Sequence, residues 1–336
     1  MKLRHLEYTF SQIENKKIVI IGDVMLDKYI YGNVERISPE VPVPIVEIQK
    51  EEYKLGGAAN VALNIKKLGA EPILISVIGN DENGRKLQDT LYQNNITDEY
   101  FLFENKRKTT CKTRIMSDIH QMMRLDYEEK TNIWELSEQK ILSFLYHLVD
   151  NFDIILLQDY NKGVLTKSLI HNVLEFCKTH NKKVLVDPKF ENFIEYKDVF
   201  LFKPNKKEFK NVILKPLDTY EEQIEEGTKF LKEMKIENLV LTLSQEGMLL
   251  LNNIDNKISI HKIPTLAKRV ADVSGAGDTV IATIATLLNS ELELVEVLNI
   301  ANIAAGIVVE EVGIVAITKE KLIEHVDKLI KQEYLQ

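Results

Sequence analysis

Two glycines and two aspartates fall within one short stretch of the chain, Asp272-Val273-Ser274-Gly275-Ala276-Gly277-Asp278-Thr279. The apolar run after it predicts a buried helix, so both glycines fall at a helix start. The first amide groups there lack intrahelical partners and lie at the positive end of the helix dipole, so bare backbone can bind an anion. Asp278 would place a carboxylate beside that anion, where it can take a proton from a hydroxyl that attacks a phosphoryl group. A tight turn with an aspartate cap is the alternative.

A second glycine pair, in Gly56-Gly57-Ala58-Ala59-Asn60, precedes another helical pattern. No lysine follows it, so we interpret it as a place where backbone approaches a sugar closely rather than as a nucleotide loop. Asn60 can donate and accept hydrogen bonds with neighbouring hydroxyls. Asp23 and Asp27 follow the apolar run Lys17–Gly22, a predicted buried strand, and open α/β sheets bind ligands beyond the carboxyl ends of their strands. Turn or cap chemistry is the alternative, and it suits Asp23 better than Asp27.

Asn205 and Glu208 lie three positions apart, so a helix that begins there would bring both onto one face. Magnesium keeps several water molecules and takes few carboxylates, and this pair suits a water-mediated magnesium site. Helix capping by Asn205 explains the pattern equally well. Asp187 follows another predicted strand and is expected at the same edge of the sheet.

Cationic residues alternate within Thr109–Met116, which places Lys112 and Arg114 on one face of an extended segment, with Arg124 shortly after it. A solvated edge strand explains this alternation, and so does the binding of a phosphate. Prolines interrupt the apolar residues of Ser38–Ile48, which excludes a central strand there and favours an edge strand or an extended flap.

The elements that would position these residues alternate along the chain. Helical and apolar extended patterns follow one another with short connections, which predicts an α/β fold with a mostly parallel sheet covered by helices. Strands are expected over 17–22, 72–79, 153–157, 184–188, 199–205 and 239–243, the last forming a hairpin with 248–251. Helices are expected over 136–149, 166–179 and 219–235.

Composition argues against several classes of function. The formal charge of −8 at pH 7 disfavours a nucleic-acid or anionic-membrane binder, which needs an extended basic surface. Cys111 and Cys177 form no C-x-x-C pair, so neither a disulfide framework nor a thiolate zinc site is expected. No apolar run could span a bilayer and the first residues lack the core of a signal peptide, which predicts a cytoplasmic protein without membrane contact. No G-x-x-x-x-G-K-[ST] motif occurs.

Taken in order, Gly56–Asn60, Asn205–Glu208 and Asp272–Asp278 resemble three motifs of the ribokinase-like (PfkB) family of carbohydrate kinases, and the resemblance covers nearly the whole chain. It implies a ribokinase-like α/β fold, with a mostly parallel central sheet, helices on both faces and a small β-sheet lid. It also implies one kinase domain over residues 1–336, with lid segments at about 28–55 and 98–127. The lid would cover the sugar, exclude water and mediate a homodimer.

The family's functional residues carry over onto matching positions of this sequence. Asp278 would be the catalytic base, and the backbone of Gly275, Ala276 and Gly277 would form the anion hole. Asn205 and Glu208 would hold magnesium. The sugar would contact Asp27, Gly56, Gly57 and Asn60. ATP would contact Lys189, Asn205, Thr242, Gly247, Gly275, Gly277 and Asn302.

Further stretches resemble the branch of this family that phosphorylates D-glycero-β-D-manno-heptose 7-phosphate; they are Gly22–Tyr29, Arg36–Pro44, Arg124–Glu129, Asp187–Lys189 and Ala301–Gly306. That resemblance implies transfer of a phosphoryl group from ATP to the C1 hydroxyl, for the synthesis of ADP-heptose and lipopolysaccharide precursors. The chain would correspond to the kinase part, which many bacteria fuse to a nucleotidyltransferase.

The acceptor of such a kinase carries its own phosphate far from C1. Lid cations would clamp it, best through a bidentate arginine, and the candidates are Arg36, Lys112, Arg114 and Arg124. Another sugar or sugar-phosphate kinase is the nearest alternative function, and a non-catalytic sugar- or nucleotide-binding regulator is an alternative of another class. The intact Asp278, Gly275 and Gly277 favour an enzyme.

Overall fold

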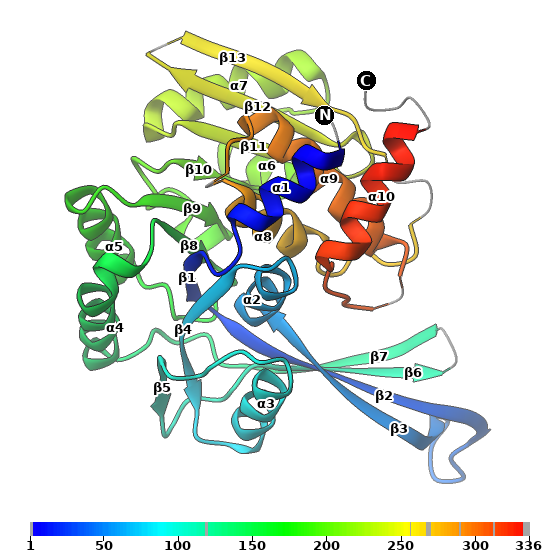
Figure 1. Cartoon of the computed structure of the whole chain (residues 1–336). Coiled ribbons are helices and arrows are strands. Elements are labelled where there is room, and N and C mark those ends of the chain that lie inside the picture. The colour runs from blue at the N-terminus through cyan, green and yellow to red at the C-terminus, as the bar shows by residue number, and fades with distance from the viewer. Residues whose placement is uncertain are drawn as a thin grey trace.

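The computed structural model describes residues 3–331 apart from 118, 119, 256, 267–269, 289 and 312, with side chains from residue 6 onward. These residues form a large sheet of strand order β13-β12-β11-β10-β9-β8-β1-β4-β5 and a separate small sheet (Figure 1). Neighbouring strands from β11 to β5 are parallel, and β12 and β13 add an antiparallel edge. The predicted mostly parallel α/β sheet is therefore confirmed.

The strands of the large sheet are β1 (Lys17–Gly22), β4 (Glu71–Gly79), β5 (Phe101–Glu104), β8 (Ile154–Gln158), β9 (Lys183–Asp187), β10 (Leu201–Phe202), β11 (Asn238–Thr242), β12 (Met248–Ile254) and β13 (Lys257–Ile263). The helices are α1 (Leu3–Gln12), α2 (Ala58–Lys67), α3 (Glu82–Gln93), α4 (Glu135–Leu148), α5 (Lys167–Thr179), α6 (Lys206–Ile213), α7 (Tyr220–Met234), α8 (Ala276–Leu287), α9 (Leu294–Val309) and α10 (Lys319–Lys331). Within the described residues, none of these helices combines the length and the apolar character needed to cross a bilayer.

Strand β1 explains how helices come to cover both faces of the sheet. Its neighbours are β8 and β4, so it lies in the interior of the sheet. Successive side chains of a strand point to opposite faces. Ile18 and Ile20 accordingly pack in the apolar cluster beneath α1, α2, α8, α9 and α10, whereas Val19 and Ile21 pack in the cluster beneath α4, α5, α6 and α7. The two groups of helices lie on opposite sides of the sheet (Figure 1).

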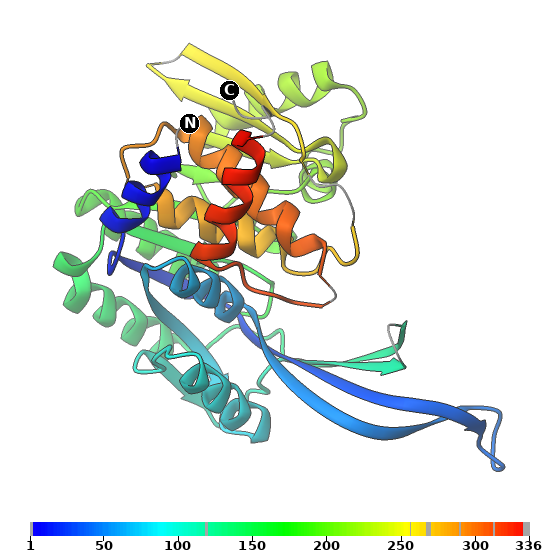
Figure 2. The ribbon, with the colours of Figure 1, turned by 45° about the vertical axis from the view of Figure 1, so that its right-hand side comes forward.

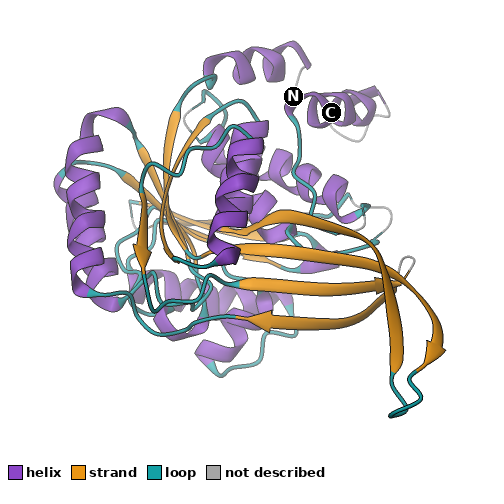
Figure 3. Cartoon of the chain, turned by 90° about the horizontal axis from the view of Figure 1, so that it is seen from below, coloured by secondary structure: helices purple, strands orange, loops and turns teal. Residues whose placement is uncertain are grey.

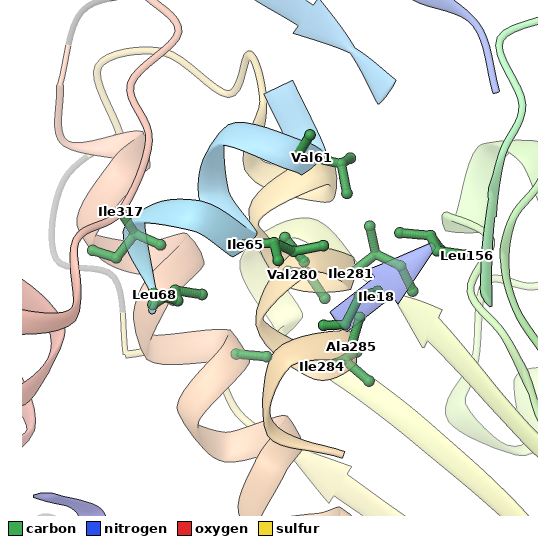
Figure 4. Packing of buried hydrophobic residues seen from close by; sticks show 14 of the residues in the cluster. Ile18, Val61, Ile65, Leu68, Leu156, Val280, Ile281, Ile284, Ala285 and Ile317 are labelled. Carbon is green, nitrogen blue, oxygen red and sulfur yellow. The ribbon is translucent and has the colours of Figure 1, made fainter. Parts of the chain in front are cut away.

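Helix α8 is the most deeply buried helix around the predicted site. Every residue from Asp278 to Leu287 is buried. Val280, Ile281 and Ile284 pack among side chains of α2 and β1 (Figure 4). Truncating one of these isoleucines to alanine would destabilise the fold by about 2–5 kcal/mol, because a cavity would remain. The first turn of α8 is therefore held rigidly.

The small sheet has the order β3-β2-β6-β7 and forms the lid. Its strands are β2 (Val24–Ile37), β3 (Pro44–Gly57), β6 (Cys111–Ser117) and β7 (His120–Tyr127). The hairpin of β2 and β3 projects far from the body, and the four strands run out side by side (Figures 2 and 3). The proline-containing segment that we expected at an edge or flap thus forms the tip and outer strand of this hairpin.

Two predicted boundaries are wrong. The lid segment expected from about residue 98 begins only at Cys111, because β5 pairs with β4 in the large sheet and buries Phe101 in the core. The strand expected over 199–205 is reduced to β10, since Pro204 follows closely and Asn205 already caps the next helix. Residues 118 and 119 of the predicted lid lie outside the described part of the chain.

Candidate active site

The Asp278 carboxylate lies in the first turn of α8 and is buried. Its Oδ1 accepts hydrogen bonds from the Tyr160 hydroxyl at 2.6 Å and from Gln158 Nε2 at 3.2 Å. Its Oδ2 accepts one from Asn60 Nδ2 at 2.9 Å. Burial raises the pKa of Asp278 to about 6, although the hydrogen bonds from Tyr160 and Asn60 favour the charged form. The group is thus mostly ionised at neutral pH and basic enough to accept a proton.

Asn60, which the sequence placed near a sugar, is in direct contact with the proposed base. Its side-chain oxygen accepts a hydrogen bond from Asn64 at 3.2 Å, and this bond orients its amide nitrogen toward Asp278. A Cβ at Gly275 would come within 3.1 Å of that nitrogen, and Gly275 has a φ of 81°. Both observations explain why glycine stands at 275.

The glycine pair of the second motif makes room for two aspartates. A Cβ at Gly56 would lie 2.0 Å from Asp27 Oδ2, and one at Gly57 would lie 2.4 Å from the backbone oxygen of Asp23. Both carboxylates are buried. We expected a sugar to approach these glycines closely. In the structure, Asp23 and Asp27 of the protein approach them, and Asp27 thereby lies at the base of the lid.

A cavity of about 1170 Å³ opens beside Asp278. Its lining contains every residue that we expected to contact ATP, namely Lys189, Asn205, Thr242, Gly247, Gly275, Gly277 and Asn302. Ala276, Glu208, Asp187 and Lys203 line it as well. These residues, from five separate parts of the sequence, thus meet in one hollow at the carboxyl edge of the sheet.

Lys203 is a cation in this cavity that sequence reasoning missed. It is buried, and its ammonium lies 3.1 Å from Asp187 Oδ2. A Cβ at Gly277 would be 3.7 Å from the same ammonium, an ordinary contact, so the helix start and Lys203 face each other. A buried cation beside bare helix amides suits the binding of an anion.

Asn205 and Glu208 form a capping box at the start of α6. Asn205 Oδ1 accepts from the Glu208 amide at 2.8 Å, and Glu208 Oε2 accepts from the Asn205 amide at 2.9 Å. The other carboxylate oxygen of Glu208 pairs with Lys189. Burial lowers the pKa of Lys189, but the carboxylates of Asp187 and Glu208 outweigh burial, so the net shift is upward. The capping alternative is therefore realised, and the magnesium role stays a prediction.

The remaining residues of the expected ATP side have local structural explanations too. Gly247 has a φ of 91°, and a Cβ there would lie 2.0 Å from the Ile263 oxygen. Asn302 donates to the Pro264 oxygen at 2.7 Å. Thr242 ends β11 and forms an isolated bridge with Asn205. These contacts place the turn between β11 and β12 on the wall of the cavity.

Three of the four lid cations lie on one face, near Asp27. In the registers of the lid, Asp27 is opposite Lys112, and Arg114 is opposite Arg124. Cross-strand partners share a face, as do alternate residues of one strand. Arg114 pairs with Asp27, and Arg124 pairs with Asp126 at 2.8 Å. Lys112 is half-buried and makes no ion pair within the described residues, and burial lowers its pKa.

Arg36 does not join these cations. It is exposed near the end of β2, where it pairs with Ile45 in the register of the hairpin. At about 3.3 Å per residue, the run of β2 from Asp27 to Arg36 spans roughly 30 Å. Within one chain Arg36 therefore lies far from Asp278.

The base of the lid also contacts the glycine motif. Asp272 accepts hydrogen bonds from the amides of Ser274 and Gly313, at 2.8 and 3.1 Å. The next residue, Ile314, donates its amide to the Tyr29 hydroxyl at 3.3 Å, and its oxygen accepts from Lys54 at 3.1 Å. Tyr29 and Lys54 belong to lid strands β2 and β3. The lid and the start of α8 are thus joined through a short loop.

Three site residues had no assigned role from the sequence: Gln158, Tyr160 and Lys203. Gln158 ends β8, and Lys203 directly follows β10. The rule that ligands gather at the carboxyl ends of parallel strands applies to both positions, and it would have identified them. Tyr160 follows two residues later in the loop after β8, where no motif distinguishes it.

A mostly parallel sheet with helices on both faces, a β-sheet lid and a buried aspartate at a helix start define a ribokinase-like phosphotransferase with an alcohol acceptor. The chain belongs to the pfkB family of carbohydrate kinases, which it matches over residues 15–321.

The bifunctional protein HldE of Nitratiruptor sp. is 40% identical over 92% of this chain. HldE of Pelobacter propionicus is 35% identical over 97% of the chain. The chain spans 64% and 66% of the length of these two proteins.

Solved structures agree on the fold. The Arabidopsis thaliana ribokinase complexed with ribose and ATP has a TM-score of 0.72 at 18% identity, over 93% of this chain and 99% of that chain. Phosphofructokinase-2 from Escherichia coli has a TM-score of 0.77 at 16% identity, over 94% and 99%. The predicted ribokinase-like fold is confirmed.

Proposed function

We propose that this carbohydrate kinase transfers the γ-phosphoryl group of ATP to the C1 hydroxyl of D-glycero-β-D-manno-heptose 7-phosphate, giving heptose 1,7-bisphosphate. The observation that carries the proposal is the place of Asp278. It contacts Asn60 on the side of the lid and lines the lysine-containing cavity on the other side. A base at this junction can serve an acceptor beneath the lid and a donor in the cavity. The HldE relatives and the resemblance to heptose kinases favour this acceptor.

The chemical step follows from the position of the base. Asp278 takes the proton of the C1 hydroxyl, so that the O–H bond breaks as a proton–carboxylate bond forms. The freed oxygen bonds to the γ-phosphorus, and the bond from phosphorus to the bridging oxygen breaks with its electron pair going to ADP. A loose transition state of this kind needs positioning and charge neutralisation more than a strong base. A carboxylate with a pKa near 6 is sufficient because the hydroxyl becomes acidic as transfer proceeds.

The phosphates of ATP would lie on the helix start and against two lysines. In the described residues α8 has no side-chain cap. The Ala276 amide donates to the Val273 oxygen at 3.3 Å, and the amides of Gly277 and Asp278 remain available to an anion. Lys203 and Lys189 line the same cavity and add positive charge. The donor set also fits magnesium, which takes few carboxylates and several waters, and Glu208, Asn205 and Asp187 are the residues that would hold it. Bound magnesium would neutralise phosphate charge.

The phosphate of the acceptor would bind on the lid face that carries Lys112, Arg114 and Arg124. Lys112 is the strongest candidate because its half-buried ammonium has no ion-pair partner within the described residues. Arg114 is held by Asp27 and by the Tyr29 ring at 5.2 Å, so its guanidinium is already oriented. An acceptor that lacks a phosphate would leave Lys112 without an ion pair within the described residues.

We also propose that two copies of the chain associate through their lids. Large apolar side chains are exposed on the lid strands, namely Ile37, Ile48, Met122, Met123 and Leu125. A second copy would cover them, and it would also bring a second Arg36 toward a lid. ATP and the sugar phosphate are the other proposed partners.

An ADP-release assay over matched pairs of sugars with and without a terminal phosphate tests the proposal. We expect heptose 7-phosphate to give the highest kcat/KM, at least about a hundredfold above heptose, because the loss of a charge-assisted phosphate contact removes on the order of 3 kcal/mol. Equal kcat/KM for heptose and heptose 7-phosphate would argue against the phosphate clamp on the lid. A higher kcat/KM with a different sugar phosphate would favour the alternative, a kinase for another acceptor. Absence of ADP release with every acceptor would favour a binding regulator.

A further inference from the structure

The two oxygens of the Asp278 carboxylate have different surroundings. Oδ1 accepts hydrogen bonds from Tyr160 and Gln158, whereas Oδ2 accepts one, from Asn60. A carboxylate oxygen accepts about two hydrogen bonds. Oδ1 is therefore saturated, and Oδ2, which accepts only from Asn60 among the described residues, keeps one lone pair.

The Tyr160 hydroxyl and the Gln158 amide can act only as hydrogen-bond donors to Oδ1. The Tyr160 hydroxyl keeps its proton, because burial and the nearby carboxylates of Asp278 and Asp187 raise its pKa well above the usual value. Gln158 Nε2 lies 3.2 Å from both Asp278 Oδ1 and Asp187 Oδ2, so its amide nitrogen faces two carboxylates. The opposite end of that amide, Oε1, is buried without a hydrogen-bond partner in the described structure. The orientation of Gln158 therefore serves the carboxylates and leaves its own oxygen unpaired.

The loop that carries Tyr160 is anchored by a buried side chain. Asp23 accepts hydrogen bonds from the amides of Tyr160, Lys162 and Val164, at 2.8, 3.1 and 3.0 Å. Asn161, within this loop, has a φ of 53°, and the loop curls around the carboxylate. The Tyr160 ring also lies beneath the Lys189 ammonium, 5.2 Å from its centroid. Tyr160 is thus held from its backbone and from its ring while its hydroxyl points to Asp278.

We propose that Tyr160 is a positioning residue for the base: its hydroxyl, with Gln158, occupies Oδ1 of Asp278 and so directs the acceptor's proton to Oδ2. Asp23 acts through Tyr160 by fixing its loop. The proton that leaves the C1 hydroxyl forms its new bond to Oδ2, beside Asn60, and Tyr160 transfers no proton. This inference rests on the proposed role of Asp278 as the base.

Tyr160→Phe tests the inference because it removes one oxygen atom and leaves the ring under Lys189. The lost hydrogen bond stabilises the ionised form of Asp278, so its pKa rises and the acid limb of kcat/KM moves to higher pH, by about one unit. We expect kcat to fall about tenfold at pH 8 and the KM values for both substrates to change less than about twofold, since the base is misoriented and the binding surfaces remain. The sugar phosphate ionises near pH 6 as well, but equally with both enzymes.

Tyr196→Phe is the matched control. Tyr196 also donates a buried hydroxyl hydrogen bond to a carboxylate, Asp159 Oδ2 at 2.7 Å, and makes no contact with Asp278. We expect this variant to lower the melting temperature and to leave the acid limb where it is. A merely structural role for Tyr160 would give the same pattern in Tyr160→Phe.

The outcomes separate this inference from the proposed function. If Asp278→Asn abolishes turnover and Tyr160→Phe moves neither the acid limb nor kcat, Tyr160 has no positioning role and the base assignment stands. If Asp278→Asn retains turnover, Asp278 is not the base, and the inference about Tyr160 fails with it. Titration of the Asp278 carboxyl carbon by NMR in the free protein provides a second measurement, in which an unchanged pKa in Tyr160→Phe overturns the inference without an assay of activity.

Discussion

The apolar side chains of helix α8 are buried, whereas many of those on the lid are exposed. Ile281 and Ile284 have no exposed surface, but Ile37 is 68% exposed and Leu125 is 51% exposed. Helix α8 therefore buries its apolar residues within one chain, and the lid does not. This contrast indicates that the chain alone fixes the position of Asp278, the proposed base, whereas the lid leaves apolar surface for another molecule to cover.

The polar groups differ in the same way. In the body, Asp278, Asp187 and Asp23 are buried and each accepts hydrogen bonds from neighbouring side chains or amides. On the lid, Arg124 is half exposed and Lys112 has no ion pair within the described residues. Rigid, paired groups suit chemistry that depends on orientation, and a cation without an ion pair, such as Lys112, suits the binding of a ligand that brings its own charge.

Replacing Asp278 with asparagine should have the largest effect, because it removes the base from the rigid region. We expect kcat to fall about a thousandfold, in the range of a lost general base. The KM for ATP and the far-ultraviolet circular dichroism should stay close to those of the wild type. Coupled ADP release measures the first quantity. Turnover within tenfold of the wild type would exclude Asp278 as the base.

Replacing lid cations should affect binding more than turnover. We expect Lys112→Ala and Arg114→Ala each to raise the KM for the sugar phosphate about ten- to a hundredfold, because a hydrogen bond between charged groups is lost. Initial-rate kinetics at saturating ATP measure this. An acceptor without a phosphate should respond little to Lys112→Ala, and an equal response would show that Lys112 does not hold the phosphate.

Arg36→Ala sharpens the same comparison. Within one chain Arg36 is too far from Asp27 to affect the KM directly. If Arg36→Ala raises the KM for the sugar phosphate above that of the wild type only at concentrations where dimers form, Arg36 acts at the site of a partner copy. The difference between the two proteins would then disappear on dilution to monomers. An unchanged KM would remove Arg36 from the clamp altogether.

Placing a charge on the exposed face of the lid should weaken association. We expect Leu125→Lys to raise the dissociation constant of the dimer about tenfold or more, since an apolar contact would be replaced by a buried charge. Leu136→Lys is the control, because Leu136 is 60% exposed on helix α4 of the body. Sedimentation velocity over a dilution series compares the two. Equal dissociation constants would argue against a dimer through the lid.

The smallest predicted effect is the pH dependence of the intact enzyme. Burial, as its main cause, raises the pKa of Asp278 to about 6, and the base must be ionised to accept a proton. We therefore expect the acid limb of kcat/KM to bend near pH 6, with activity falling about tenfold for each further unit downward. A limb that bends near pH 4 would mean that the carboxylate is not desolvated during catalysis.

The strands and helices of the body were largely predictable because their buried positions carry apolar residues, which form recognisable patterns in the sequence. Strand β1 follows its apolar run at both ends. The lid boundary was less predictable, since β5 and β6 both look like exposed extended segments and only pairing distinguishes them.

The site was predictable where a local motif limits the backbone, as at Gly275 and Gly57, which both have positive φ. The contacts between distant side chains were not predictable, although the strand-end rule places Gln158 and Lys203 at the right edge of the sheet. Gln158 ends β8 and Tyr160 lies in the loop after it, and both reach Asp278 only through the tertiary placement of α8. Lys203 depends on the same neighbourhood. No spacing within the sequence encodes these contacts.

The hydrogen bonds of Asp278 connect positions that are synthesised at very different times. Tyr160 and Asp278 are separated by 118 positions, and Asn60 and Asp278 by 218. A chain emerging from the ribosome can complete the donors at Asn60, Gln158 and Tyr160 long before the carboxylate that they bind exists. Until α8 emerges and inserts beside α2, Asn60 and Tyr160 lack this acceptor, whereas Gln158 can still donate to Asp187. With Asp278 as the proposed base, we expect a chain that lacks α8 to be inactive, and the appearance of activity during translation would report the final docking of α8.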